Sequence, residues 1–181
     1  LQLTDTGTGT VTLTSFNSPQ GPNIDLGAET LVLNNTPQNI LDCTISGSGN
    51  FIKDGPGRLI VRNTLTYTGT TTVNDGFYRG GYIAGQIQST FDGGGPMVVN
   101  SPGVIEFNVG AGVSQTVTGV ISGDGEIQKI ENGTLIFDGP SANTFSGGFM
   151  LGDGASTTFD GVDQGAQEGI VIVNRGDHFG T

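Results

Sequence analysis

The chain contains Ile45-Ser46-Gly47-Ser48-Gly49-Asn50-Phe51-Ile52-Lys53 and repeats this stretch, 76 positions later, as Ile121-Ser122-Gly123-Asp124-Gly125-Glu126-Ile127-Gln128-Lys129. The correspondence continues into two apolar segments, Gly57-Arg58-Leu59-Ile60-Val61 and Gly133-Thr134-Leu135-Ile136-Phe137. Self-similarity over tens of residues is typical of proteins that are built from stacked structural repeats. We therefore expect the repeat, rather than any single motif, to define the fold.

The two copies share a set of turn and apolar positions beyond these segments. Tyr67-Thr68-Gly69 matches Phe145-Ser146-Gly147 after a two-residue insertion, and the copies close on Val73-Asn74-Asp75-Gly76 and Leu151-Gly152-Asp153-Gly154. We expect the shared positions to form ladders between successive coils: Gly47, Gly49, Lys53, Tyr67 and Gly69 in the first copy, and Gly123, Gly125, Lys129, Phe145 and Gly147 in the second. The pattern divides the chain into a partial repeat at about 1–30 and repeats at about 31–104 and 105–181.

Within each repeat, short apolar strands alternate with corners that contain glycine. Glycine and asparagine tolerate positive φ at such corners, and parallel strands of successive coils stack about 4.8 Å apart. This rhythm predicts one all-β domain over residues 1–181, a right-handed parallel β-helix with essentially no α-helix and about 20–25 residues per coil. A β-sandwich, which has turns every 8–12 residues, is the alternative fold.

Composition supports strands and excludes several functions. Of 181 residues, 33 are glycine and only 13% are charged, with a net charge of −11. Strong helix formers are scarce, which argues against a helical bundle. An acidic surface does not neutralise phosphates, so nucleic acid and anionic membranes are not expected partners. No apolar run in the sequence has membrane-spanning length, and the single cysteine, Cys43, has no internal disulfide partner.

The repeat resembles the passenger-associated repeat of bacterial autotransporters. The first copy carries Ser46-Gly47-Ser48-Gly49, Lys53, Gly55-Pro56-Gly57, Leu59 and Tyr67-Thr68-Gly69, and the second departs from the pattern at Glu131-Asn132. The resemblance implies a parallel β-helix that is exported through the outer membrane and lies at the bacterial cell surface. It also implies a role in adhesion or surface structure. In that family the repeat is a structural and secretion element and does not identify an activity.

The sequence offers little for catalysis or for a cofactor. The only histidine is His178, three residues from the end, and most aspartates sit in glycine turns, where their side chains bond local backbone amides. We therefore expect no enzyme activity and no cofactor. Weak calcium binding by the acidic surface is compatible with the composition, although no stretch completes a calcium-binding nonapeptide. A polysaccharide-degrading or carbohydrate-binding β-helix, similar to a tailspike, is the alternative function.

One segment is present only in the first copy, at about 77–86. It contains Phe77, Tyr78, Arg79 and Tyr82, and aromatic and arginine side chains often carry contact energy in interfaces. We expect this segment to fold over an apolar face or to form a further short strand; a loop that contacts a ligand or partner is the alternative. The equivalent Lys53 and Lys129 either line a binding face or pair with carboxylates. The tripeptide Arg175-Gly176-Asp177 arises easily by chance in so acidic and glycine-rich a chain.

Together these features predict an extracellular structural and adhesive scaffold of a bacterial surface protein. Its expected partners are a host or cell-surface ligand, a polysaccharide, or further copies of itself. Uncapped solenoid ends expose strand edges that pair with other chains, so head-to-tail stacking into filaments is a further expectation. No membrane insertion by this segment is expected.

Overall fold

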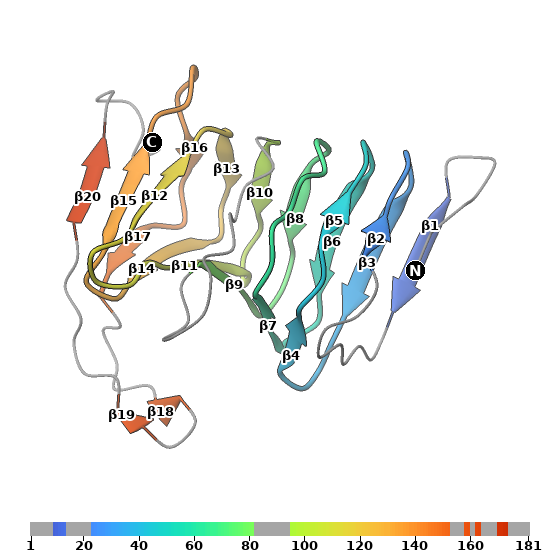
Figure 1. The fold of residues 1–181 in the computed structure, drawn as a ribbon, viewed down its shortest axis with the longest axis horizontal. Coiled ribbons are helices and arrows are strands. Elements are labelled where there is room, and N and C mark those ends of the chain that lie inside the picture. Colours follow the sequence, from blue (N-terminus) through green and yellow to red (C-terminus); the bar gives the residue numbers. More distant parts are fainter. Residues whose placement is uncertain are drawn as a thin grey trace.

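The structure, a computed structural model, describes residues 9–13, 23–81, 95–152, 158–159, 162–163 and 170–173. Within these ranges every regular element is a strand, and no helix occurs. The strands lie side by side along the long axis of the molecule, from β1 in blue near the N-terminus to β20 in red near the C-terminus (Figure 1). No described helix is long and apolar enough to cross a membrane. The predicted all-β parallel solenoid is confirmed.

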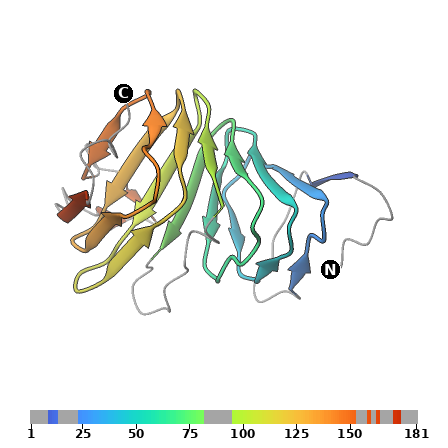
Figure 2. The same ribbon diagram turned by 90° about the horizontal axis from the view of Figure 1, so that it is seen from above.

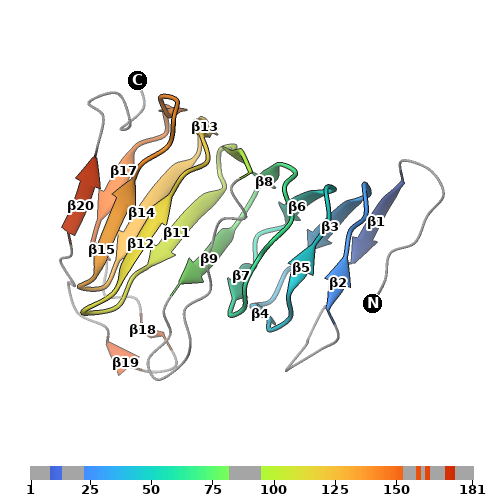
Figure 3. The ribbon, with the colours of Figure 1, turned by 45° about the horizontal axis from the view of Figure 1, so that its top comes forward.

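Two long parallel sheets form two sides of the solenoid (Figure 3). The seven-stranded sheet contains, in spatial order, β1 (Thr10–Leu13), β3 (Thr30–Asn34), β6 (Asn50–Asp54), β8 (Thr71–Val73), β10 (Met97–Val99), β13 (Ile121–Gly123) and β16 (Thr144–Phe145). The six-stranded sheet contains β4 (Asn39–Leu41), β7 (Arg58–Val61), β9 (Phe77–Gly81), β11 (Val104–Asn108), β14 (Glu126–Ile130) and β17 (Phe149–Leu151).

The third side consists of two smaller parallel sheets. Near the N-terminus β2 (Ile24–Asp25) pairs with β5 (Ile45–Ser46), and Leu65 forms a bridge to Ile45. Near the C-terminus the sheet contains β12 (Ser114–Val117), β15 (Thr134–Phe137) and β20 (Ile170–Val173). A separate antiparallel pair is formed by β18 (Thr158–Phe159) and β19 (Val162–Asp163). Seen from above, successive coils stack along the long axis of the solenoid (Figure 2).

Coil length varies along the solenoid. In the seven-stranded sheet Thr10 pairs with Thr30 and Thr30 with Asn50, so each of these coils advances the chain by 20 positions. Thr71 pairs with Met97, 26 positions later, and Met97 pairs with Ile121, 24 positions later. Along the seven-stranded sheet the longest of these steps therefore lies between the two copies of the repeat, while on the third side Thr134 pairs with Ile170, 36 positions later.

Alternation along each strand separates core from surface. In β6 Phe51 and Lys53 are buried while Asn50, Ile52 and Asp54 are not, as the period of two in a strand requires. Inward positions of successive coils stack into apolar columns, and the buried side chains of all sides meet in one core. That core includes Cys43, whose thiol pKa is raised by burial.

Two corners are lined by backbone that leaves no room for a side chain. A Cβ added at Gly49 would lie 1.9 Å from the carbonyl oxygen of Glu29, and one at Gly69 would lie 2.1 Å from the carbonyl oxygen of Gly49. At the corner between the seven-stranded and the six-stranded sheet, a Cβ at Gly147 would lie 2.2 Å from the carbonyl oxygens of Asp124 and Gly125. Successive coils thus pack backbone against backbone at these corners, which only glycine permits.

The two copies of the repeat occupy different sides of the solenoid. Ile45 lies on the third side and Lys53 on the seven-stranded sheet. The equivalent Ile121 lies on the seven-stranded sheet and Lys129 on the six-stranded sheet. The copies keep the same local structure but are displaced by one side, because 76 residues do not correspond to a whole number of these coils.

Candidate functional site

Lys53 is a buried lysine that binds a turn from inside the core. Its side chain has no exposed surface and lies in a column between Leu33 and Val73. The Nζ atom donates hydrogen bonds to the carbonyl oxygens of Asp54, Gly55 and Asp75, at 3.0, 2.6 and 3.0 Å. Burial lowers the pKa of Lys53 to about 8, although the negative charges of Asp75 and Asp54 oppose the shift.

Lys129 repeats this arrangement on the six-stranded sheet. It is also fully buried, in a column with Phe107 and Leu151. Its Nζ donates to the carbonyl oxygen of Ile130 at 3.2 Å and to that of Glu131. Burial lowers the pKa of Lys129, and the charge of Glu131 opposes that shift. Both lysines therefore bind backbone carbonyls and hold corners, so the expected binding face and carboxylate pairs are wrong.

Glu131 shows how strictly the corner is preserved. It occupies the position of Gly55 in the first copy and adopts a left-handed φ of 68°, where Gly55 has 79°. Non-glycine residues pay for this conformation because Cβ approaches the following carbonyl. The departure from the glycine turn in the sequence thus changes the residue but leaves the backbone conformation unchanged.

The segment at 77–86 begins with five residues that form a strand, as one of the two preferred interpretations expected. Phe77–Gly81 is strand β9, in register with β7 on one side and β11 on the other. Tyr78 points into the core with no exposed surface, and its ring lies 5.7 Å from that of Phe51. Apolar residues stacked above and below β9 favour the strand over a loop. Tyr82 lies outside the described residues.

The other predicted ladder positions are structural. Tyr67 is 3% exposed and its hydroxyl bonds Thr71 Oγ1, while Phe145 lies buried in β16. The six glycines lie at corners: Gly47, Gly49 and Gly69 where the chain enters the seven-stranded sheet, and Gly123, Gly125 and Gly147 where it leaves that sheet for the six-stranded one.

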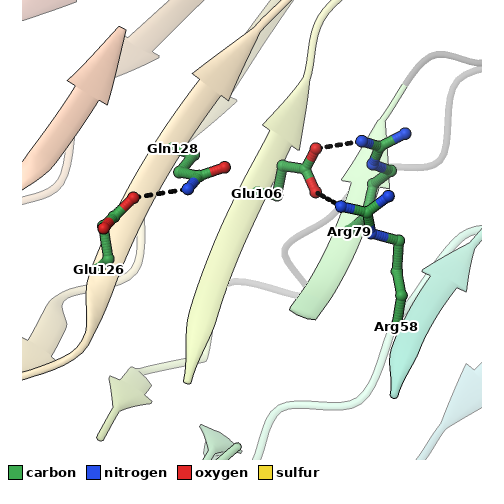
Figure 4. A network of polar contacts seen from close by, with 5 residues as sticks. All are labelled: Arg58, Arg79, Glu106, Glu126 and Gln128. Carbon is green, nitrogen blue, oxygen red and sulfur yellow. Dashed lines mark hydrogen bonds and ion pairs between the residues drawn. The ribbon is translucent and has the colours of Figure 1, made fainter. Parts of the chain in front are cut away.

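Charged side chains gather on the outer face of the six-stranded sheet. Arg79 in β9 and Glu106 in β11 are paired in register, and Arg79 Nη2 donates to Glu106 Oε1. Arg58 in β7 lies 3.6 Å from the other Glu106 oxygen and 4.7 Å above the Phe77 ring. Figure 4 shows the Arg58 and Arg79 side chains converging on Glu106 from neighbouring strands. Burial lowers the pKa of Arg58, which the charge of Glu106 opposes.

The neighbouring strand extends this polar face. Gln128 in β14 is paired in register with Glu106, and its Nε2 donates to Glu126 Oε1 at 2.5 Å (Figure 4). Glu106 is 2% exposed and Arg79 is 7% exposed, although both point away from the core. Sequence reasoning singled out Arg79 but missed Arg58 and the role of Glu106. The signal in the sequence was a glutamate that stands among apolar residues in the stretch Val104–Asn108.

No other predicted site is assembled in the part of the chain that the structure describes. Within it, no group of three or more acidic, histidine or cysteine side chains is placed to hold a metal ion. His178 and Arg175-Gly176-Asp177 lie outside the described residues. Phe77 and Glu106 share the outer face of the six-stranded sheet, whereas Tyr78 faces the core.

Comparisons with known proteins agree with the repeat. The passenger-associated-transport-repeat family matches residues 3–22, 51–77 and 127–159. The adhesin BmaC autotransporter of Brucella suis biovar 1 (strain 1330) is 33% identical over 146 residues, which cover 75% of this chain and 4% of that protein. No solved structure matches. The resemblance drawn from the sequence is confirmed: three stretches of the chain match the passenger-associated-transport repeat.

Proposed function

We propose that this chain is a non-catalytic, adhesive segment of a β-solenoid passenger that is displayed outside the bacterial cell. The observation that carries the proposal is the repeat itself, because its two copies match the passenger repeat and a relative of similar sequence is named an adhesin. Because the chain spans 4% of that relative, the segment contributes one part of a much longer surface.

The charged cluster supports a binding role over a catalytic one. Acid–base hydrolysis of a polysaccharide needs two carboxyl groups that reach the substrate. Glu106 is instead engaged by Arg79 and Arg58, and Glu126 accepts a hydrogen bond from Gln128. Side chains held by their neighbours in this way suit recognition of a ligand by a rigid surface.

Surface display tests the proposal. The chain is fused to an outer-membrane export barrel in a non-adherent laboratory bacterium, and attachment to cultured epithelial cells is counted. Bacteria that display the chain are expected to attach several-fold more often than bacteria that display a β-solenoid of similar length and charge from an unrelated protein. Equal attachment, with equal display shown by antibody, would contradict the adhesive role.

We also propose that the solenoid end near β17 pairs with a second copy of the chain. Leu151 ends an inward-facing column yet is 49% exposed, and β16 and β17 stand at the edges of their sheets. Sedimentation of the purified chain over a hundredfold range of concentration is expected to show growing oligomers, which Leu151→Asp abolishes. A monomer throughout would contradict stacking. Repeating the series with calcium tests the weak ion binding expected of an acidic surface.

A further inference from the structure

Four Asp-Gly dipeptides lie within the described residues and differ in what holds the aspartate side chain. They are Asp54-Gly55, Asp75-Gly76, Asp124-Gly125 and Asp138-Gly139. An aspartate followed by glycine is prone to cyclise, because glycine has no Cβ that would hinder attack of its amide nitrogen on the aspartate carboxyl carbon. The dipeptide is the same in all four places, so the surrounding structure decides which of them reacts.

Asp75 is the one of these four aspartates whose carboxylate bonds the amide that follows it. The amide nitrogen of Gly76 donates to Asp75 Oδ1 at 2.7 Å. This contact brings the carboxyl carbon next to the nitrogen that would attack it. Asp75 is half-buried and keeps part of its surface exposed to water. Holding two reacting groups together in this way replaces the chance encounter that a flexible chain needs.

Lys53 bonds the same peptide unit through its carbonyl oxygen. Its Nζ atom donates to the carbonyl oxygen of Asp75 at 3.0 Å. An amide nitrogen becomes nucleophilic when it loses its proton, and the negative charge then lies largely on the carbonyl oxygen of that amide. An ammonium group bonded to this oxygen stabilises the charge as it develops. Because Lys53 has no exposed surface, water screens this interaction only weakly.

Asp54 shares the lysine but not the placement of the carboxylate. Lys53 Nζ also donates to the carbonyl oxygen of Asp54, at 3.0 Å. Asp54 Oδ1, however, accepts a hydrogen bond from Asn74 Nδ2 at 2.7 Å. The carboxylate of Asp54 is therefore directed to the next coil and not to the amide of Gly55. Asp54 separates the effect of carboxylate position from that of the lysine.

Asp124 has both of its reacting groups engaged elsewhere. Its Oδ1 accepts a hydrogen bond from the amide of Ser101 on the preceding coil at 2.8 Å. The amide of Gly125 donates to the carbonyl oxygen of Val99 at 2.9 Å. Asp124 is therefore the matched control for Asp75. Asp138 is exposed, and its side chain makes no hydrogen bond to the described residues, so it reports the rate of an unheld dipeptide.

We propose that Asp75 cyclises spontaneously with the amide of Gly76 and is converted to isoaspartate, and that Lys53 promotes this conversion. The Gly76 nitrogen attacks the carboxyl carbon of protonated Asp75 and closes a five-membered succinimide ring. The carboxyl hydroxyl leaves with the amide proton as water. Water then opens the ring at either carbonyl carbon. Opening at the former side-chain carbon restores aspartate, and opening at the former main-chain carbon gives isoaspartate.

The isoaspartate product places a negative charge at Lys53. The main-chain carbonyl that accepts from Lys53 Nζ becomes a carboxylate, and the former side-chain carboxyl becomes the neutral peptide link. The net charge of the chain is unchanged, but the anion moves toward the buried ammonium group. Because a buried charge is stabilised when it is paired, Lys53 favours the isoaspartate product over aspartate.

Peptide mapping of the purified 181-residue chain measures the reaction. The chain is incubated for several weeks in heavy-oxygen water at mildly acidic pH, folded or in urea, so that each ring opening incorporates one heavy oxygen. Trypsin places Asp75 and Asp124 in separate peptides, 63–79 and 80–129. In the folded chain isoaspartate is expected to accumulate at Asp75 at least fivefold faster than at the other three dipeptides, and in urea at similar rates in all four. Equal rates in the folded chain, or the same preference in urea, would overturn the proposal.

Asparagine and glutamate variants test formation of the ring. Asp75→Asn closes the same ring and expels ammonia, so uptake of heavy oxygen at this position is expected to rise at least tenfold. Asp124→Asn is the matched control and is expected to react at least fivefold more slowly than Asp75→Asn. Asp75→Glu would need a six-membered ring and is expected to show no uptake there. Equal rates in the two asparagine variants, or uptake in Asp75→Glu, would contradict a ring selected by the fold.

Lys53→Met tests the lysine apart from its effect on stability. A loosened corner alone would raise the rate at Asp75 and would leave the ratio of isoaspartate to labelled aspartate unchanged. If Lys53 promotes the conversion, the rate at Asp75 falls toward that of Asp138, and the proportion of isoaspartate among the products also falls. A higher rate with an unchanged ratio would overturn the role of Lys53. None of these measurements involves attachment to cells, so the site and the adhesive function stand or fall separately.

Discussion

The two copies of the repeat place equivalent lysines on different sides of the same solenoid. Lys53 lies inside the seven-stranded sheet and donates to carbonyls of its own turn and of the next coil. Lys129 lies inside the six-stranded sheet and, among the described residues, donates to its own turn at Ile130 and Glu131. Asp153, the repeat equivalent of Asp75, lies outside the described residues. The local motif is therefore preserved, whereas the columns differ: Lys53 stacks between Leu33 and Val73, and Lys129 between Phe107 and Leu151. What a repeat position touches depends on coil length as well as on the motif.

The longer coils between the two copies explain this difference. Between Thr71 and Met97 the chain advances by 26 positions, against 20 in the coils before it. Extra residues in one coil shift the phase of every later motif relative to the three sides. Equivalent positions of the two copies therefore do not stack on one another. The corner glycines show this, because those of the first copy precede the seven-stranded sheet and those of the second precede the six-stranded sheet.

The largest difference between the copies is expected at their corner glycines. At Gly49 a new Cβ would meet the carbonyl oxygen of Glu29 at 1.9 Å, whereas at Gly125 it would meet Val99 Cγ2 at 2.5 Å and the carbonyl oxygen of Gly103 at 2.6 Å. The overlap at Gly125 is smaller, and part of it falls on a side chain, which can move more readily than backbone. We expect Gly49→Ala to lower the free energy of unfolding by about 3–5 kcal/mol and Gly125→Ala by about half as much. Urea denaturation followed by circular dichroism measures both, and equal losses would contradict the contrast.

The buried lysines should differ next. Lys53→Met leaves three carbonyl oxygens without their donor, and Lys129→Met leaves two among the described residues. Because an unpaired buried polar group costs about 1–3 kcal/mol, we expect losses of about 2 kcal/mol for Lys53→Met and about 1 kcal/mol for Lys129→Met. The same urea experiment ranks them. A neutral or stabilising Lys53→Met would show that its hydrogen bonds do not outweigh the desolvation of the ammonium group.

The pKa of Lys53 predicts how stability changes with pH. The folded-state value is about 8 and the ordinary value is 10.5. Between these values the unfolded chain binds more protons than the folded chain, so the free energy of unfolding rises with pH. We expect wild type to gain stability relative to Lys53→Met from about pH 8 to 10.5. The variant is the control for every other titrating group. A constant difference across this range would indicate an unshifted lysine.

The smallest expected effect is on the free energy of unfolding at the equivalent positions Gly55 and Glu131, where substitutions are expected to act in opposite directions. Gly55 and Glu131 share a left-handed conformation, which strains glutamate but not glycine. Glu131→Gly is expected to raise the free energy of unfolding by up to about 1 kcal/mol. Gly55→Ala should lower it, because its Cβ would also lie 2.6 Å from Asn34 Oδ1. Thermal melts at one pH compare the pair. Destabilisation by Glu131→Gly would mean that the Glu131 side chain stabilises the corner.

The sequence was sufficient to predict the solenoid but not the side of the solenoid on which each copy of the repeat lies. Repeated strands and glycine corners follow from local preferences, so the all-β parallel fold and the corner glycines were predictable. The side on which each copy lies depends on the sum of all preceding coil lengths, which one sequence does not provide. For the same reason the sequence did not decide whether the segment from Phe77 forms a loop or a further strand, because it has no equivalent in the second copy.

The polar cluster was harder to predict than the fold. Arg58, Arg79 and Glu106 are separated by 21 and 27 positions and meet only because three coils stack in register. Their residue types alone are common on protein surfaces. The predicted aromatic ligand residues instead divide between the two faces of β9, since a strand alternates.

Crosslinking across the phase change tests the central claim most directly. In a Cys43→Ala background, Val98→Cys is combined with either Ser122→Cys or Gln128→Cys and treated with a short thiol crosslinker, while Ile52→Cys with Thr72→Cys serves as the positive control. The account predicts that Val98 crosslinks to Ser122, its register partner in β13. Gln128 occupies the repeat position of Ile52 and would replace Ser122 there if the two copies were stacked in phase. Crosslinking of Val98 to Gln128 instead of Ser122 would contradict the account.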